Sequence, residues 1–174
     1  DDGADSLNGQ GGADTLNGGA GTDQVAYFLE TGTQGVQVNL ETGTAVDTFG
    51  RLDVLISIEQ VHGSNMADTL TGAATADLLF GRHRADLLQG LGGADTLIGG
   101  QGADTLNGGA GGDQVAYFLE TGTRGVLVDL RAGIATDTYG DSDTLISVEY
   151  VHGSNFNDTI YGSDTGDDRI FGVM

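Results

Sequence analysis

Isolated apolar residues recur at nine-residue intervals along much of the chain, and each is flanked by polar residues. The apolar positions include Leu16, Val25, Leu97, Leu106 and Val115, and the flanking positions include Thr15, Asn17, Gln24 and Thr105. Because successive side chains of a strand point to opposite faces, we expect the apolar residues to point inward and their neighbours to face water. No segment has the pattern of a long helix, so the periodicity predicts an all-β fold made of short strands.

Gly-rich loops separate the predicted strands and follow the template G-G-x-G-x-D-x-U-x, in which U is apolar. The template is matched at every position by residues 18–26, 99–107 and 108–116, and residues 9–17 and 90–98 lack only its second glycine. Such a repeat is typical of a calcium site built into a repetitive fold.

Each template position has a physical role. Glycine lets the chain turn through positive φ and brings backbone carbonyls close to an ion, while the aspartate at the sixth position supplies negative charge. Calcium prefers six to eight oxygen ligands, so one carboxylate is not enough and two stacked loops are needed. The candidate metal-site residues are Gly3, Asp5, Gly12, Asp14, Gly19, Gly21, Asp23, Asp68, Asp77, Asp86, Gly93, Asp95, Gly100, Gly102, Asp104, Gly109, Gly111, Asp113 and Asp158.

The chain also contains a duplication with an offset of 90 residues, which equals ten nonapeptides. Residues 24–33 return letter for letter as residues 114–123. We expect one elongated repeat domain over residues 1–174, with a first unit at 9–98 and a truncated second unit at 99–174.

Two segments, residues 27–62 and 117–152, lack the Gly-rich loops and each span 36 residues, the length of four nonapeptides. We therefore expect each segment to form two modified coils that keep the register of the repeat. Alternating apolar and polar residues predict half-buried strands at 35–40 and 125–130, and a looser one at 55–61.

With the register kept, the aspartates fall into two rows on opposite edges of the fold. One edge carries Asp5, Asp23, Asp77, Asp95 and Asp113, and the other carries Asp14, Asp68, Asp86, Asp104 and Asp158. The best ion sites then pair Asp5 with Asp23, Asp95 with Asp113, Asp86 with Asp104, and Asp77 with Asp95.

The loops at 63–68, 72–77 and 81–86 keep the opening glycine and the aspartate but lose the middle glycines. Two alternatives remain open for this part of the chain. One is weak calcium binding, and the other is replacement of the ion by Arg82 and Arg84, which would pair with neighbouring aspartates.

Composition narrows the class of protein. The chain has 32 glycines, no cysteine, proline or lysine, and a formal net charge of −20, so a cation must neutralise its self-repulsion. Without cysteine there is no disulfide framework, and metal ions are the expected staples. The acidic surface argues against binding to nucleic acid or anionic membranes, and no apolar run has the length of a membrane span. The chain begins without Met, and we expect it to be a piece of a longer protein.

On these nonapeptides, the chain resembles the RTX family of bacterial secreted proteins, the hemolysin-type calcium-binding repeats. Residues 35–40 (G-V-x-V-x-L) and 53–64 (D-x-L-I-S-I-E-x-V-x-G-S) are also similar to segments found between such repeats. The resemblance implies an all-β, right-handed parallel β-roll with two inserted strand-rich segments, in which two nonapeptides make one turn. It also implies about three to five calcium ions held between stacked loops, and export by a type I secretion system.

Catalytic interpretations are weaker. Glu59 and His62, like Glu149 and His152, have the Glu-x-x-His spacing of helical metal ligands, but residues three apart on a strand point to opposite faces. We therefore expect both histidines to cap a strand. No nucleophile elbow, P-loop or HExxH motif occurs, so we do not expect an enzyme.

Asp137, Asp141 and Asp143 form an acidic cluster whose counterpart in the first copy contains Arg51. Because the copies differ, we expect a solvated loop here in preference to an extra ion site. Core packing at the end of a strand is the expected role of the aromatic residues Tyr27, Phe28, Tyr117 and Phe118.

The leading functional hypothesis is a noncatalytic, secreted, extracellular module that folds and is stabilised on binding calcium. Two alternatives stay open: a spacer or adhesive repeat of a cell-surface protein, and a module that assists substrate binding by an attached protease, lipase or polysaccharide-modifying enzyme. The expected partners are calcium ions and neighbouring repeats or a catalytic domain of the parent protein, and no feature of the sequence supports polysaccharide contact as a further one.

Overall fold

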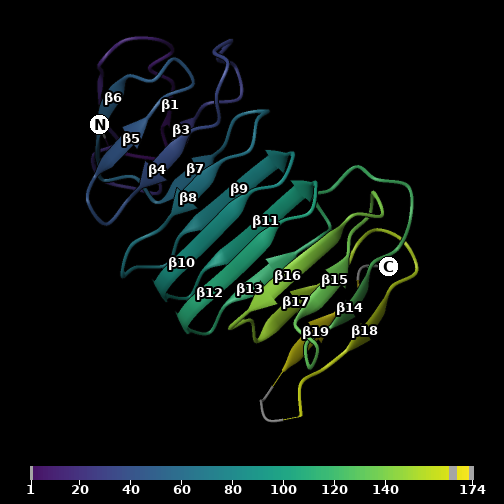
Figure 1. Cartoon of the computed structure of the whole chain (residues 1–174). Coiled ribbons are helices and arrows are strands. Elements are labelled where there is room, and N and C mark those ends of the chain that lie inside the picture. The colour runs from purple at the N-terminus through teal and green to yellow at the C-terminus, as the bar shows by residue number, and fades with distance from the viewer. Residues whose placement is uncertain (1, 165–167, 173–174) are drawn as a thin grey trace.

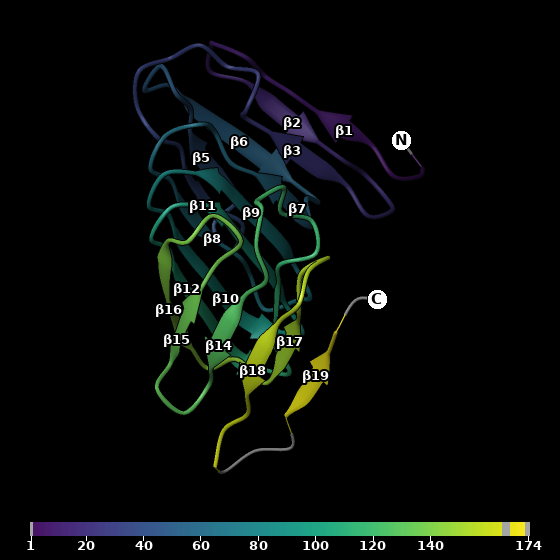
Figure 2. The same ribbon diagram turned by 90° about the vertical axis from the view of Figure 1, so that its right-hand side faces the viewer.

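The computed structural model describes residues 2–164 and 168–172, and its regular secondary structure consists of strands alone within that part of the chain. The strands form two sheets that enclose one apolar core. Figures 1 and 2 show the coils stacked from the N-terminal end of an elongated molecule to its C-terminal end. The described residues include no helix of the length and apolarity that crossing a membrane requires.

Among the described residues, the first sheet has eight strands, all paired in parallel. In spatial order they are β1 (Ser6–Leu7), β3 (Gln24–Ala26), β7 (Gln60–His62), β9 (Leu78–His83), β11 (Thr96–Gln101), β13 (Gln114–Ala116), β17 (Tyr150–His152) and β19 (Arg169–Phe171).

The second sheet has eleven strands in the part of the chain that the structure describes. In spatial order they are β18 (Thr159–Tyr161), β14 (Leu127–Asp129), β15 (Ile134–Thr136), β16 (Ser142–Ile146), β12 (Thr105–Gly111), β10 (Leu87–Gly93), β8 (Thr69–Thr71), β4 (Gln37–Asn39), β5 (Thr44–Val46), β6 (Leu52–Ile56) and β2 (Thr15–Asn17).

One regular turn of the chain passes through both sheets, and the nonapeptide period places equivalent residues side by side. In the eight-stranded sheet Leu97 lies between Leu79 and Val115. All five residues predicted to point inward are buried, with Leu16 the most exposed at 9 %. Their neighbours Thr15 and Asn17 are exposed, and Gln24 and Thr105 are half-buried. The structure therefore confirms the predicted parallel β-roll, while its right-handedness and the unit boundaries at 9–98 and 99–174 stay predictions.

The inserted segments differ from the prediction of two modified coils. In the eight-stranded sheet β3 pairs directly with β7, so residues 27–62 make only one turn. The extra length forms an antiparallel meander of β4, β5 and β6 in the other sheet, between β8 and β2. Strands β14, β15 and β16 repeat this arrangement in the second copy. The length of four nonapeptides predicted two coils, but one coil together with the two hairpins of the meander uses the same number of residues.

The strands predicted within the insertions are found in part. The alternating segments at 35–40 and 125–130 contain β4 and β14, with Val36 and Val38 buried. Residues 55–61 do not form one strand, because the chain turns at Ser57, where φ is +51°, between β6 and β7.

Candidate metal-binding site

The nonapeptide aspartates occupy two rows, each immediately before the strands of one sheet. Asp5, Asp23, Asp77, Asp95 and Asp113 precede β1, β3, β9, β11 and β13 of the eight-stranded sheet. Asp14, Asp68, Asp86, Asp104 and Asp158 precede β2, β8, β10, β12 and β18 of the eleven-stranded sheet. The rows are those predicted, because each insertion returns the chain to the same sheet at which it left.

In each row, a hydrogen bond to one carboxylate oxygen joins two aspartates that lie 18 residues apart, on successive coils. The Oδ1 atom accepts a hydrogen bond from the backbone N–H of the aspartate that lies 18 residues earlier. This bond joins Asp5 to Asp23 (2.8 Å), Asp77 to Asp95 (2.8 Å), Asp86 to Asp104 (2.8 Å) and Asp95 to Asp113 (2.9 Å). All four aspartate pairs proposed from the sequence are thus in contact.

The second oxygen points back into its own loop, where the first glycine leaves room for it. An ideal Cβ on Gly99 would lie only 2.3 Å from Oδ2 of Asp104. Gly102 has a φ of +144°, and a Cβ there would lie 2.0 Å from the carbonyl oxygen of Arg84 in the preceding coil. Glycine is required at both positions because carboxylate and backbone oxygens crowd the loops.

The loops keep this shape even where a glycine is missing. Every predicted glycine except Gly12 has a positive φ. Gln10, Arg82 and Leu91 replace the second glycine of their loops and still have φ values of 58°, 87° and 74°. The stacking of the coils therefore imposes a conformation that these side chains disfavour.

Buried carboxylate oxygens without a hydrogen-bond partner mark the edges of the roll. The group comprises the Oδ2 atoms of Asp14, Asp23, Asp86, Asp95, Asp104 and Asp113. A buried, unpaired carboxylate is costly, so these oxygens call for protons or for a cation. Burial is the main reason that the pKa of Asp86 is raised to about 9, and the charges of Asp68 and Asp104 add to the shift.

The loops that lack the middle glycines differ among themselves, and the loop at 153–158 departs from the template in the same way as 63–68, 72–77 and 81–86. Both oxygens of Asp68 are bonded, Oδ1 to the hydroxyl of Ser64 (2.6 Å) and Oδ2 to the Ser64 backbone N–H (2.6 Å). Ser154 bonds Asp158 in the same way. Oδ2 of Asp86 has no partner, so the loop at 81–86 offers a free carboxylate oxygen to an ion. In the loops at 63–68 and 153–158, by contrast, both carboxylate oxygens of the aspartate accept hydrogen bonds from the serine of the same loop.

The arginine alternative is not what the structure contains. The guanidinium carbon of Arg82 lies 4.2 Å above the centre of the Phe28 ring, on the outer surface. Within residues 2–164 and 168–172, the ion pairs are those of Arg131 with Asp129 and Asp164. No arginine therefore neutralises the described rows of aspartates.

The inserted segments supply acidic residues that the template did not reveal. Glu59 accepts a bond from the N–H of Asp23 (2.9 Å), and Asp53 accepts one from the N–H of Asp14 (3.0 Å). Their counterparts Glu149 and Asp143 do the same for Asp113 and Asp104. The signal that could have found them is their recurrence in both copies at an offset of 90 residues.

The prediction of a solvated loop around Asp137, Asp141 and Asp143 was wrong. Asp137 is fully buried and Asp143 is 2 % exposed. Their counterparts in the first copy, Asp47 and Asp53, are fully buried as well. These side chains are buried because the β5–β6 and β15–β16 turns fold over the ends of the Gly-rich coils.

The histidines have no convergent metal partner. Glu59 bonds backbone at the roll edge, whereas the His62 ring packs on the outer surface between Phe28 and Phe80, at 6.2 and 5.4 Å between ring centres. Burial lowers the pKa of His62, and the charge of Arg82 adds to this. Tyr27 and Tyr117 are buried in the core as predicted. The same prediction was wrong for Phe28 and Phe118, which are half-buried and pack against the rings of His62 and His152 outside the core.

The geometry fits a hard cation that takes oxygen ligands. No group of three or more His, Cys, Asp or Glu side chains within residues 2–164 and 168–172 is arranged so that it could hold a metal ion. Two carboxylates from stacked loops must therefore be completed by backbone carbonyls, which is how a Gly-rich loop can serve calcium.

Comparison with known families gave one match that covers most of the chain. The sequence profile of the family described as RTX calcium-binding nonapeptide repeat matches four stretches: residues 1–26, 59–82, 84–115 and 148–172. The gaps between these stretches contain both antiparallel meanders. No curated protein matched the chain.

Proposed function

Because this chain belongs to the RTX calcium-binding nonapeptide repeat family, we propose that it is the calcium-dependent folding and stabilising module of a secreted bacterial protein. The observation that carries the proposal is the set of buried Oδ2 atoms without partners along both edges of the roll. These atoms face loops whose carbonyls crowd around the same positions.

Calcium would act by neutralising these carboxylates and linking successive coils. Each ion would be held by two aspartates from stacked loops, such as Asp86 with Asp104 or Asp95 with Asp113, together with loop carbonyls. An ion that binds only the folded chain stabilises it by RT ln(1 + [L]/Kd), about 1.4 kcal/mol at tenfold excess over Kd, and several ions add up. We expect about three to five ions.

The affinity of such sites would couple folding to export. Extracellular calcium modules have dissociation constants of roughly 0.1–1 mM, so the sites would be empty in the cytosol and filled outside the cell. The chain would then be unfolded before export by a type I system and folded after it. We propose no catalytic role for the module itself.

Far-ultraviolet circular dichroism tests this function on the chelator-treated chain. Calcium is expected to produce a steep, cooperative coil-to-strand transition, and magnesium, which prefers fewer ligands in strict octahedral geometry, is expected not to. A chain that is folded in chelator and unchanged by calcium would refute the proposal.

A further inference from the structure

Each inserted segment gathers buried carboxylates around one tyrosine hydroxyl. The Tyr27 cluster consists of Tyr27, Asp14, Glu30, Asp47 and Asp53. The Tyr117 cluster consists of the residues found 90 positions later, Tyr117, Asp104, Glu120, Asp137 and Asp143. Every member of the first cluster therefore has an identical counterpart in the second.

Hydrogen bonds hold the first cluster in place from three directions. Asp53 joins Asp14 of the Gly-rich loop, since its Oδ1 accepts the Asp14 N–H at 3.0 Å. Glu30 arrives from the loop after β3, where its Oε2 accepts the Thr48 hydroxyl at 2.8 Å. Asp47 lies at the β5–β6 turn, with its Oδ1 bonded to the Arg51 N–H at 2.6 Å.

Every group of the Tyr27 cluster, and every group of the Tyr117 cluster except Asp143, keeps one buried oxygen without a hydrogen-bond partner. In the Tyr27 cluster these atoms are the Tyr27 hydroxyl, Oδ2 of Asp14, Asp47 and Asp53, and Oε1 of Glu30. In the Tyr117 cluster they are the Tyr117 hydroxyl, Oδ2 of Asp104 and Asp137, and Oε1 of Glu120. The tyrosines are at most 1 % exposed, so water does not satisfy their hydroxyls from outside.

The hydroxyl and the carboxylates are close enough to influence one another. Burial is the main cause that raises the pKa of Tyr27, followed by the charges of Asp53, Glu30, Asp47 and Asp14. In the second copy burial and then Asp143, Glu120, Asp137 and Asp104 raise the pKa of Tyr117. Both copies of the duplicated segment thus place a buried, unpartnered hydroxyl within the electrostatic influence of the same set of acids.

We propose that each insertion builds a divalent-cation site of its own, additional to the sites between nonapeptide loops. Asp53 and Asp143 take the place that the next nonapeptide aspartate has in a regular coil, as their bonds to Asp14 and Asp104 show. Glu30 and Glu120 add negative charge from a loop that regular coils lack. The identity of the ion as calcium rests on the proposed function.

The chemistry of the cluster selects a hard cation. All the unpartnered atoms of the cluster are oxygens, which suit calcium or magnesium and not a soft, thiophilic metal. Because no three described acidic side chains are arranged to hold an ion alone, at most two carboxylates of a cluster bind the ion directly. Backbone carbonyls of the Gly-rich loop complete the coordination, and the remaining carboxylates contribute charge.

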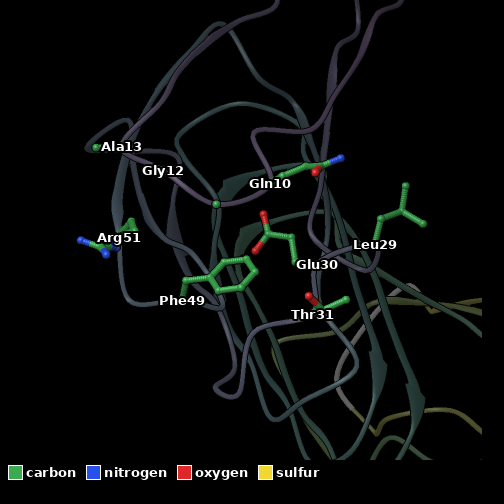
Figure 3. Close-up of a pocket in the computed structure, with 9 residues that line it drawn as sticks. Gln10, Gly12, Ala13, Leu29, Glu30, Thr31, Phe49 and Arg51 are labelled. Carbon is green, nitrogen blue, oxygen red and sulfur yellow. The ribbon is translucent and has the colours of Figure 1, made fainter.

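Glu30 is the member of the Tyr27 cluster that lines a surface hollow of about 560 Å³. Figure 3 shows the Glu30 carboxylate pointing into this hollow between Gln10 and Phe49, with Arg51 on its rim. The equivalent of Arg51 is Asp141, whose charge helps to raise the pKa of Asp104. The two copies also differ at a second position, because Arg124, which lies beside Gly140 of the β15–β16 turn, takes the place that the neutral Gln34 has beside Gly50. Each site therefore has one arginine near its turn, Arg51 in the first copy and Arg124 in the second.

Terbium luminescence tests the proposal in the intact chain. Tb³⁺ replaces calcium at oxygen sites and is excited by energy transfer from a nearby phenol, and this chain has five tyrosines and no tryptophan. Changing Tyr27→Phe together with Tyr117→Phe is expected to remove most of the sensitised emission. Each change removes only a hydroxyl that has no partner, so the fold is kept. The matched control is Tyr161→Phe, because Tyr161 is 49 % exposed and belongs to neither cluster.

A second variant tests the ligands themselves. Asp53→Asn with Asp143→Asn is expected to lower the number of bound calcium ions by one per cluster in equilibrium dialysis, while Glu41→Gln, an exposed change in the same insertion, lowers it by none. Arg51→Asp is expected to tighten terbium binding severalfold. Emission that survives both tyrosine changes, or an unchanged ion count, would overturn the proposal. Either result can occur with calcium-dependent folding intact, so it is distinct from failure of the proposed function.

Discussion

Asp104 should affect stability with opposite signs in the presence and absence of calcium. Its Oδ1 accepts the Asp86 N–H at 2.8 Å, and its Oδ2 is buried without a partner. Asp104→Asn keeps the acceptor and the shape of the side chain but removes the charge. The substitution therefore separates the cost of a buried carboxylate from the benefit of a bound ion.

The structure sets the size of both effects. Burial, with smaller contributions from Asp137 and Asp141, raises the pKa of Asp104 from 3.8 to about 6. At neutral pH this shift corresponds to about 3 kcal/mol against the charged, metal-free folded chain. We expect Asp104→Asn to stabilise the metal-free chain by about 1–3 kcal/mol. In calcium it should destabilise the chain by about 1.4 kcal/mol for each ion lost at tenfold excess over Kd.

Folding can be measured by far-ultraviolet circular dichroism in both conditions. With calcium, urea unfolding gives the change in free energy. With chelator, a sulfate titration promotes folding of the metal-free chain, and the variant should fold at lower sulfate. Glu41→Gln, at an exposed side chain outside the ion pairs of the described residues, is the control for loss of charge alone. A change of the same sign in both conditions would refute the reasoning.

Further predictions concern the loops, the core and pH. Gly102→Ala should destabilise the roll by about 3 kcal/mol or more, because the new methyl group clashes with the preceding coil and the positive φ is strained. Gly3→Ala should cost only about 1–2 kcal/mol, because φ is +132° there but nothing lies within 4 Å of the new Cβ. Urea unfolding measures both changes. Leu91→Gly should stabilise the chain by about 1 kcal/mol, because it relieves a φ of 74° at a residue that is 39 % exposed. Leu88→Ala should lower the free energy of unfolding in calcium by about 2–5 kcal/mol. Without metal, the folded chain should be most stable below about pH 4, where the buried carboxyl groups are protonated. Its stability should fall as the pH rises through about 6 and about 9, the raised pKa values of Asp95 and Asp86. A pH series of dichroism spectra measures this trend. With calcium the trend should reverse, because acid protonates the ligands.

The nonapeptide part of this fold was predictable because one short pattern sets both strand and turn. An apolar residue such as Leu97 and the aspartate two positions before it determine which side chain is buried and which carboxylate lies at the edge. Spacing then determined the two rows, since every regular coil repeats after 18 residues.

The inserted segments were less predictable because their length fits two architectures. Thr-Gly-Thr at 42–44 and the turn at 47–51 mark the two hairpins, with Gly43 and Gly50 at φ values of 65° and 78°. The buried acids were missed for another reason. Asp47 lies in the turn before β6, where residues are normally solvated. Asp53 lies on the inward face of β6 between the exposed Leu52 and Val54, so the hydrophobic pattern gives no sign that it is buried.

A crystal structure grown in calcium, with anomalous scattering data that locate the ions, tests the central claim most directly. The account predicts anomalous peaks between successive coils, next to Oδ2 of the Asp86–Asp104 and Asp95–Asp113 pairs. An ordered roll in which those oxygens contact only water would contradict it.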